Sequence, residues 1–345
     1  MGGCEAVDFA GKPAWHGLGA TVEKGMTSED ALRLAQLDWE VVQRPIFTMY
    51  TYGGDLDTVP GYMVNCRSDN GNSLGVVGGS NYEIMQNRDM FAMMDSLEKD
   101  GIVKYESAFS LRGGRRVCVL VRLPELPDIG TDERPDRLAQ CLLWTTGHDG
   151  AKVMTITPTS LRVACANTLR IALSQEQSRA LRIIHDRNAN ANVRIKAAVA
   201  AIEAAKSTFA GWTEQAWKVA RTEIHEADRR EIWWHAICGG ITNNNELPAN
   251  LPNRTRTRIE NSLLAIASYW RYNDTAWSAF NAVTAWADHE GTWKSPEHRF
   301  LATQDGVRDQ IKQRGWRKTL EVCSCPPFDA PAGWRGRAAH APDLA

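Results

Sequence analysis

The chain has 345 residues, of which 43% are apolar and 23% charged, a composition typical of globular proteins and not of disordered or fibrous ones. Its 40 basic and 41 acidic residues leave a net charge of −1, so affinity for a polyanion would require a local basic cluster. Residues 1–10 lack the order of a secretory signal, and no run approaches the ~20 apolar residues that cross a bilayer. We therefore expect a cytoplasmic protein with no membrane partner.

The eight cysteines are spread along the whole chain, which predicts free thiols in a reducing compartment. Only Cys323 and Cys325 lie close together. A Cys-x-Cys pair with no further Cys or His nearby falls short of the four ligands of a structural zinc site. We predict no bound metal and no cofactor, and the role of the Cys323–Cys325 segment stays open.

The amino-terminal part of the chain alternates short apolar runs with turn residues. Residues 27–37 predict a short helix with an N-cap and first-turn acids, and residues 40–50 predict a strand. The runs 62–67 and 74–77 flank an Asn-Gly turn, which predicts a hairpin. These elements indicate an α+β unit.

The next stretch continues this pattern with a helix and two hairpins. Asn87–Lys99 has apolar residues at helical spacing and Gly101 just past its end, which predicts a helix. The two hairpins pair residues 103–110 with 115–123 and residues 139–146 with 152–157. A helix through residues 167–173 is expected to follow.

The composition changes at residues 188–192, and beyond them the apolar residues recur at helical spacing. Helices are predicted through residues 195–216, 259–270, 275–289 and 307–322. The sequence therefore predicts an α+β fold with a hairpin-rich mixed domain over residues 1–187, a helical domain over residues 188–322 and a flexible Pro/Gly-rich tail over residues 323–345.

The first of the two hairpins is strongly basic. Its residues 104–122 carry one acid, Glu106, and five basic residues: Lys104, Arg112, Arg115, Arg116 and Arg122. A glycine-rich turn lets backbone amides and guanidinium groups approach a phosphate chain, so Gly113 and Gly114 are included in a predicted nucleic-acid site. The alternative is a solvated hairpin tip whose arginines serve solubility.

Further residues extend this predicted surface. Lys152, Arg162 and Arg170 continue the positive bias downstream. The aromatic residues Tyr105, Phe109 and Trp144 lie on the same strands, where they would either stack on unpaired bases or belong to the core.

Thirteen tryptophans is a high number for this length, and most of those in the helical part fit a bundle core. The adjacent pair Trp233 and Trp234 cannot both face one core from a helix. One of them is therefore a candidate contact with a protein partner or with a second copy of the chain.

The best candidates for catalysis or metal binding are His148 with Asp149 and Asp288 with His289. Adjacent residues on a helix point apart, so Asp288 and His289 need help from elsewhere to hold one metal. Asp149 is also explained by a turn. We assign no catalytic residues, and whether the two pairs converge in space stays open.

Several stretches together resemble the phage- and plasmid-like protein family that carries the domain of unknown function 932. The matching stretches lie in one order from residue 13 to about 290: Trp15–Gly19, Asp38–Trp39, Arg44–Pro45, Pro60–Tyr62, Arg67–Asp69, Gln86–Asn87, Ser110–Arg116, His148–Gly150, Arg162–Val163, Cys165–Leu169, Asn281–Thr284 and Asp288–His289. The resemblance implies an origin in a mobile element, and it supplies no catalytic residues.

Taken together, these features favour a non-enzymatic DNA-handling protein that binds single-stranded DNA and serves strand annealing. The helix, two-hairpin, helix order is also similar to the core of single-strand annealing recombinases, a likeness at the level of fold only. The alternatives are a counter-defence or interaction protein acting through its helical part, and a metal-dependent nuclease. The sequence preference, the oligomeric state and any protein partner stay open.

Overall fold

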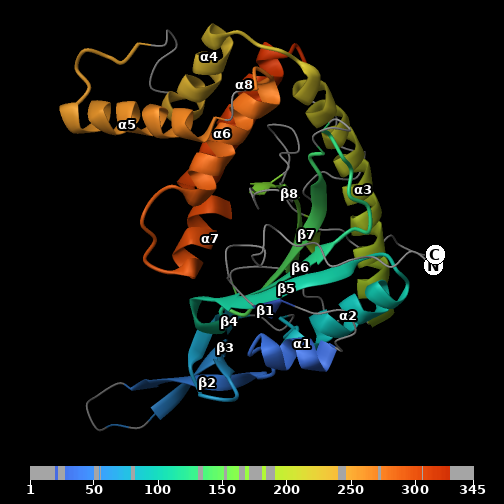
Figure 1. The fold of residues 1–345 in the computed structure, drawn as a ribbon. Helices are drawn as coiled ribbons and strands as arrows, with labels where there is room; N and C mark the ends of the chain where they lie inside the picture. Colours follow the sequence, from blue (N-terminus) through green and yellow to red (C-terminus); the bar gives the residue numbers. More distant parts are fainter. Residues whose placement is uncertain are drawn as a thin grey trace.

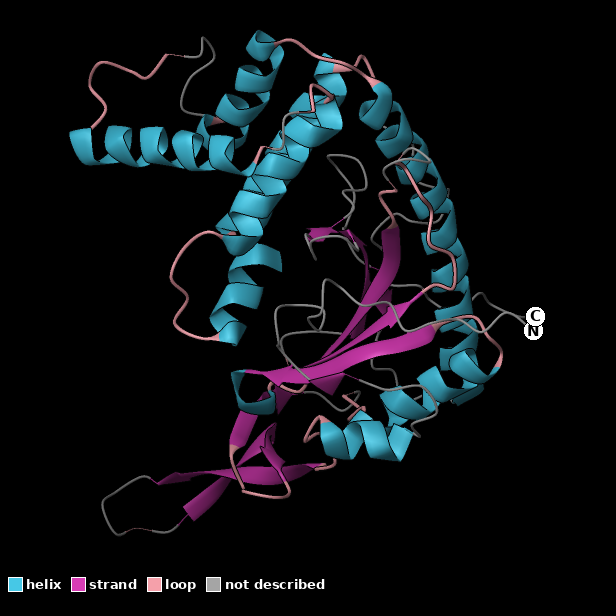
Figure 2. Cartoon of the chain, viewed as in Figure 1, coloured by secondary structure: helices cyan, strands magenta, loops and turns pink. Residues whose placement is uncertain are grey.

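Strands dominate the first half of the chain and helices the second, as the α+β prediction required. The computed structural model describes residues 20–21, 28–49, 54, 56–78, 82–130, 135–150, 154–162, 168–170, 181–183, 191–239, 246–270, 273–304 and 306–326. Figures 1 and 2 show that the larger sheet lies in the middle, with helices on both sides.

The larger sheet is antiparallel and contains both predicted hairpins. Its order is β1-β5-β6-β7-β8-β10, and β9 also pairs with β8. The strands are β1 (Ala20–Thr21), β5 (Lys104–Leu111), β6 (Arg116–Arg122), β7 (Leu138–Gly147), β8 (Met154–Arg162), β9 (Thr168–Arg170) and β10 (Leu181–Ile183). Pro158, the register partner of Leu142 on β7, lies between the stretches of β8 that pair with β10 and with β9, so its missing N–H falls where neither of those two strands pairs.

A smaller sheet of order β2-β3-β4 projects from the molecule. It is formed by β2 (Val41–Met49), β3 (Leu56–Arg67) and β4 (Ser73–Gly78). The turn between β3 and β4 contains Gly71 at φ 72°, as expected of the predicted Asn-Gly hairpin. The helices α1 (Ser28–Leu34) and α2 (Asn87–Lys99) pack together beside it.

The second half is a set of helices: α3 (Ala191–Arg221), α4 (Glu226–Cys238), α5 (Asn253–Tyr269), α6 (Ala276–His289), α7 (Pro296–Gln304) and α8 (Val307–Val322). Thr275 caps α6 by accepting a hydrogen bond from the Ser278 N–H at 3.2 Å. The expected helix through residues 167–173 is wrong for Thr168–Arg170, which pair with Thr159–Leu161. The open edge of β8 offers hydrogen bonds that override the weak local preference of this short segment.

Each face of the larger sheet is covered by helices. One hydrophobic cluster joins Val119 and Trp144 to α2 and to Phe209 of α3, while a second cluster on other sheet residues includes Phe109 and Phe300 of α7. Because the first cluster runs from Ala31 to Cys325, the two predicted domains share a core. The boundary after residue 187 lies outside the described residues and stays a prediction.

The carboxyl-terminal segment remains packed against the fold beyond residue 323, where a flexible tail was predicted to begin. Cys323 and Cys325 are each only 7% exposed, and the Gln215 side-chain amide of α3 donates to the Pro326 carbonyl at 2.6 Å. The predicted flexible tail therefore does not begin at residue 323, and residues 327–345 lie outside the described part. The six cysteines that the structure describes are free thiols. Among the described helices, none combines the length and apolarity needed to span a bilayer.

Candidate nucleic-acid interface

The tip of the β5–β6 hairpin is a tight turn that presents two arginines to solvent. Leu111 and Arg116 are register partners, and a short 3-10 turn, Arg112–Gly114, joins the strands. Arg112, Gly113 and Gly114 all have positive φ, at 53°, 69° and 101°. Arg112 thus adopts a backbone conformation that non-glycine residues seldom take, a feature that clusters at functional sites.

Contacts from two other parts of the fold hold this tip in place. Gly114 lies so close to Trp39 that an added Cβ would be 2.9 Å from Trp39 Cζ2. The Arg67 guanidinium donates to the Gly113 carbonyl at 3.4 Å, and the Arg112 N–H donates to Glu297 Oε1 of α7 at 2.7 Å. The tip is therefore a fixed junction between the two sheets and α7.

The structure separates the predicted basic residues by their surroundings. The tip arginines, Arg112 and Arg115, are exposed, and neither forms an ion pair with a described residue. Lys104 and Arg116 are half-buried. Lys152 lies outside the described residues, as does the side chain of Arg170. Two cations of the predicted set thus project freely from the tip.

Arg122 is a correction to the predicted site. It is 2% exposed, and its Nε lies 2.5 Å from Glu106 Oε1 on the neighbouring strand. Burial raises the pKa of Glu106, and the Arg122 charge opposes that rise. Since its guanidinium is enclosed by the sheet and by a carboxylate, Arg122 cannot reach a phosphate in this structure.

Arg162 is also engaged by an acidic partner. Its Nε donates to both Asp136 oxygens, at 2.6 and 2.8 Å, and the Trp277 indole N–H donates to Asp136 Oδ2 at 2.8 Å. This cluster ties β8 to α6. The arrangement is a structural one, and the Arg162 side chain is 29% exposed.

The three aromatic residues predicted to stack on bases are all buried. Tyr105, Phe109 and Trp144 are 7%, 3% and 0% exposed. Tyr105 donates to the Phe91 carbonyl at 2.9 Å, and Phe109 packs edge-on against Phe300 at 5.0 Å between ring centroids. The base-stacking expectation is wrong for these rings, because helices cover both faces of the sheet.

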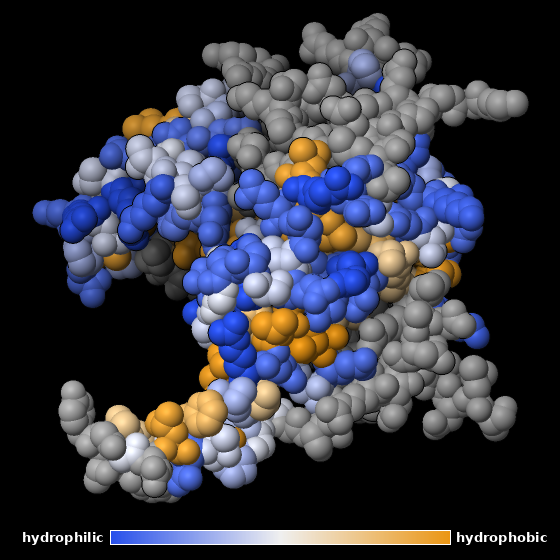
Figure 3. All heavy atoms as spheres, turned by 90° about the horizontal axis from the view of Figure 1, so that it is seen from below, coloured by the Kyte–Doolittle hydropathy of each residue, from blue (hydrophilic) through white to orange (hydrophobic). Residues whose placement is uncertain are grey.

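Exposed aromatic side chains lie instead on the smaller sheet, whose Arg67 end contacts the tip. Phe47 and Tyr62 are 52% and 53% exposed. The register places Phe47, Met49 and Leu56 on one face of the β2–β3 ribbon, and Figure 3 shows apolar side chains on this projecting part. Pro45 on the edge strand β2 and Pro60 in the part of β3 that β4 does not pair with were the available sequence signal, since proline is typical of strand positions with an unpaired side.

His148 belongs to the packing around the tip. It is 0% exposed, its Nε2 lies 2.9 Å from Asn87 Oδ1, and its ring meets Trp39 edge-on at 5.6 Å. The Asn65 side-chain amide donates to the His148 carbonyl at 2.8 Å. Asp149 is half-buried beside Gly75. These contacts connect the hairpin ends of both sheets to α2.

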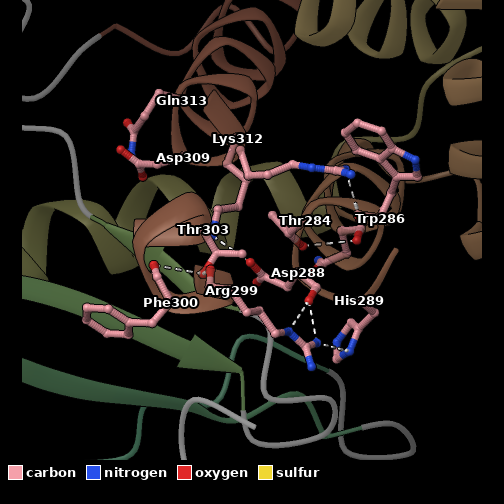
Figure 4. A network of polar contacts seen from close by, with 12 residues as sticks. Thr284, Trp286, Asp288, His289, Arg299, Phe300, Thr303, Asp309, Lys312 and Gln313 are labelled. Atoms are coloured by element: carbon pink, nitrogen blue, oxygen red, sulfur yellow. Dashed lines mark hydrogen bonds and ion pairs between the residues drawn. The ribbon is translucent and has the colours of Figure 1, made fainter. Parts of the chain in front are cut away.

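Asp288 and His289 belong to a different polar cluster, formed by α6, α7 and α8 (Figure 4). Asp288 Oδ1 and Lys312 Nζ are 2.8 Å apart, with side chains 1% and 0% exposed. The Arg299 guanidinium of α7 donates to the Asp288 carbonyl through Nε at 2.9 Å and contacts His289 Nδ1 at 3.4 Å. The cluster therefore fastens three helices together around a buried ion pair.

In the part of the chain that the structure describes, no group of three or more His, Cys, Asp or Glu is placed to hold a metal ion. His148 contacts Asn87 of α2, Asn65 of the small sheet and the Arg115 carbonyl, whereas Asp288 contacts Arg299 of α7 and Lys312 of α8. The described contacts thus do not bring the two His–Asp pairs together in one site, as the nuclease hypothesis requires.

The predicted tryptophan anchor is only partly available. Trp233 is 7% exposed, and its indole N–H donates to the Ala279 carbonyl of α6 at 2.9 Å. Because Trp233 is buried between α4 and α6, the prediction that it is an exposed anchor for a partner is wrong. Trp234 is half-buried and faces a different direction along α4.

Comparison with known proteins places the chain in one family. Residues 73–313 match the family described as Domain of unknown function (DUF932), and this match covers more than half of the chain. No curated protein and no solved structure matches the chain. The matched region contains the basic hairpin, the buried Asp288–Lys312 pair and every helix from α2 to α7. The chain therefore belongs to the family of domain of unknown function 932.

Proposed function

We propose that this protein binds single-stranded DNA in the cytoplasm, without cleaving it, on behalf of a phage or plasmid. Strand annealing is the activity that such binding would serve. The observation that carries the proposal is the pair of exposed tip arginines, Arg112 and Arg115, on a turn fixed by Trp39 and Glu297.

The electrostatics of the tip favour a polyanion. Other arginines near it are paired with carboxylates, as Arg67 is with Asp69 at 2.7 Å. The guanidinium groups of the tip arginines have no such described partner and are open to phosphate oxygens, while the Glu297 carboxylate at the Arg112 N–H is the one described acid in contact with the turn. A chain with net charge −1 attracts DNA only through such a local cluster.

The smaller sheet supports a preference for unpaired bases. Tyr62 and Phe47 are exposed on the sheet that holds the tip through Arg67 and Trp39. Exposed aromatic faces together with a basic surface are used by proteins that bind single strands without sequence preference. The bases of a duplex are stacked on each other and would not offer these faces.

The direct test is fluorescence anisotropy with a labelled oligothymidylate of about 20 nucleotides, titrated with salt between roughly 50 and 200 mM. We expect the logarithm of the association constant to fall linearly with the logarithm of the salt concentration. A duplex of the same length should bind more weakly. Absence of binding at the lowest salt would remove the proposal. Release of shorter fragments in the presence of Mg²⁺ or Mn²⁺ would favour the nuclease alternative.

The alternative, an interaction or counter-defence protein that acts through its helical part, has less structural support than the sequence indicated. Since Trp233 is buried, the half-buried Trp234 is what remains of the predicted pair, and among the described residues of the helical part Trp217 of α3 is 50% exposed. Any homo-oligomer would be detected in the same samples by light scattering.

A further inference from the structure

A groove separate from the hairpin tip lies where α5 meets α6 and α8. Its volume is about 660 Å³, within the range of small-molecule sites. It is lined by Arg254, Thr255, Thr257, Arg258, Asn261, Ser262, Ala265, Trp286, Glu290 and Arg308. The α5 members recur at helical spacing, so they form one face of that helix.

The groove is positively charged and has several polar side chains in its lining. Arg254, Arg258 and Arg308 face a single acid, Glu290. Among the residues that the structure describes, Arg254 and Arg258 are exposed and form no ion pair. Hydroxyl and amide groups from Thr257, Asn261 and Ser262 complete the lining. Together, these groups match the oxygens of an anion better than an apolar ligand.

The basic start of α5 is unfavourable for that helix. α5 begins at Asn253, and its first turn contains no acid but holds Arg254 and Arg256, with Arg258 in the next turn. The positive end of the helix dipole repels cations there and attracts anions. A bound anion would relieve this repulsion and would itself be stabilised by the helix end.

The third arginine is held in a fixed orientation by α6. The Arg308 guanidinium lies 3.8 Å from the centroid of the Trp286 ring and is half-buried. Its two terminal nitrogens donate, each at 3.4 Å, to the carbonyls of Trp286 and Glu290. The positive charge is therefore positioned before any ligand arrives, which reduces the entropy lost on binding.

We propose that the α5 groove binds phosphate groups, with Arg254 and Arg258 as direct contacts and Arg308 as a fixed positive charge behind them. Two sources supply this chemistry: the backbone of a nucleic-acid strand, or a free polyphosphate such as that of a nucleoside triphosphate. The groove shares no residue with the β5–β6 tip, so this proposal stands or fails independently of the proposed function.

The test compares the wild-type chain with a double variant, Arg254→Gln with Arg258→Gln. Inorganic triphosphate is titrated by calorimetry, and a labelled oligothymidylate by anisotropy. We expect the double variant to weaken at least one of the two by about tenfold or more, because each arginine loses charged hydrogen bonds. If the double variant loses triphosphate binding, the ligand of the groove is a free polyphosphate. If it loses only oligonucleotide binding, the ligand is the backbone of a nucleic-acid strand.

A matched control separates the groove from overall charge. Arg230→Gln with Arg317→Gln removes the same charge from exposed positions on α4 and α8 that do not line the groove. It should change either affinity by less than about twofold in moderate salt. Equal weakening by the control and groove variants would overturn the proposal, as would wild-type protein that binds neither probe.

A third variant should act in the opposite direction. Glu290→Gln removes the opposing charge and keeps an oxygen for the Tyr269 hydroxyl, which now donates to Glu290 Oε2 at 3.1 Å. We expect binding about two- to fivefold tighter, because one repulsive charge is gone. Unchanged or weaker binding would contradict the assignment. A tip variant that loses oligonucleotide but keeps triphosphate would show that the two sites are separate.

Discussion

Arg122 and Glu106 form an ion pair across β5 and β6, with 2.5 Å between Nε and Oε1 and with the Arg122 side chain only 2% exposed. This pair makes Arg122 part of the sheet, although it belongs to the same basic hairpin as the tip arginines. Substitution of Arg122 should therefore change stability, whereas substitution of the tip arginines should change binding.

Replacing Arg122 with Met should destabilise the fold by about 3–5 kcal/mol, because the Glu106 carboxylate, on a side chain only 12% exposed, loses its ion-pair partner. Urea unfolding at neutral pH measures this loss. The double variant Arg122→Met with Glu106→Leu should recover most of it. A single variant as stable as the wild type would contradict the structural role of the pair.

The same variant should show a characteristic pH dependence. Burial already raises the pKa of Glu106 above its ordinary 4.5, and removal of Arg122 removes the opposing effect. The folded state of the variant then binds more protons than the unfolded state above pH 4.5, so its stability falls as pH rises through that window. We expect the difference in unfolding free energy between wild type and variant to be smaller at about pH 4 than at pH 7.

The tip arginines should affect binding and leave stability unchanged. Arg112→Gln with Arg115→Gln should reduce the slope of log affinity against log salt by about 1.4, because each single-strand phosphate contact contributes ~0.7. Unfolding free energy should change by less than about 0.5 kcal/mol per site. The control variant Arg230→Gln with Arg317→Gln should keep the wild-type slope, and an unaltered slope in the tip variant would identify a solvated tip.

Tyr62 tests the contribution of the small sheet to DNA binding. Tyr62→Ala should weaken oligothymidylate binding by about 1–3 kcal/mol without changing the salt slope, since a stacked base is lost and no phosphate contact is lost. Tyr62→Phe keeps the ring and should bind like the wild type. Equal binding by all three proteins would show that bases do not reach this sheet.

Two adjacent glycines test how firmly the tip is docked. Gly113→Ala meets no atom within 4 Å, so its cost is the left-handed backbone alone, about 1 kcal/mol. Gly114→Ala would also place a methyl group 2.9 Å from Trp39, so it should cost roughly 1–3 kcal/mol more. Thermal unfolding of both variants provides the comparison, and equal losses would mean that Trp39 does not clamp the tip.

The buried pair of Asp288 and Lys312 predicts strong coupling between α6 and α8. Asp288→Ala should destabilise the protein by about 3–5 kcal/mol, because it removes the carboxylate that lies 2.8 Å from the buried Lys312 ammonium. Asp288→Leu with Lys312→Met should be considerably less damaging than the sum of its single changes. Strict additivity in this double-mutant cycle would show that the two charges do not interact.

Local periodicity was enough to predict most elements. The predicted helix Asn87–Lys99 and the predicted helix Val307–Val322 have the bounds of α2 and α8, and the two hairpins are β5–β6 and β7–β8. Apolar spacing, N-caps and glycine turns are properties of neighbouring residues, so one sequence carries them. Thr168–Arg170 departs from its predicted helix because its partner strand β8 decides its conformation.

The sequence by itself determined the α+β order of elements, the family and the presence of a basic hairpin with a glycine turn. Only the tertiary structure decided which charges and rings reach solvent. Strand alternation assigns residues to two faces, but whether a face is exposed depends on distant helices, here α3 and α7, that cover Trp144 and Phe109. The α5 groove likewise exists only because packing brings Arg308 of α8 beside Arg254 and Arg258 of α5.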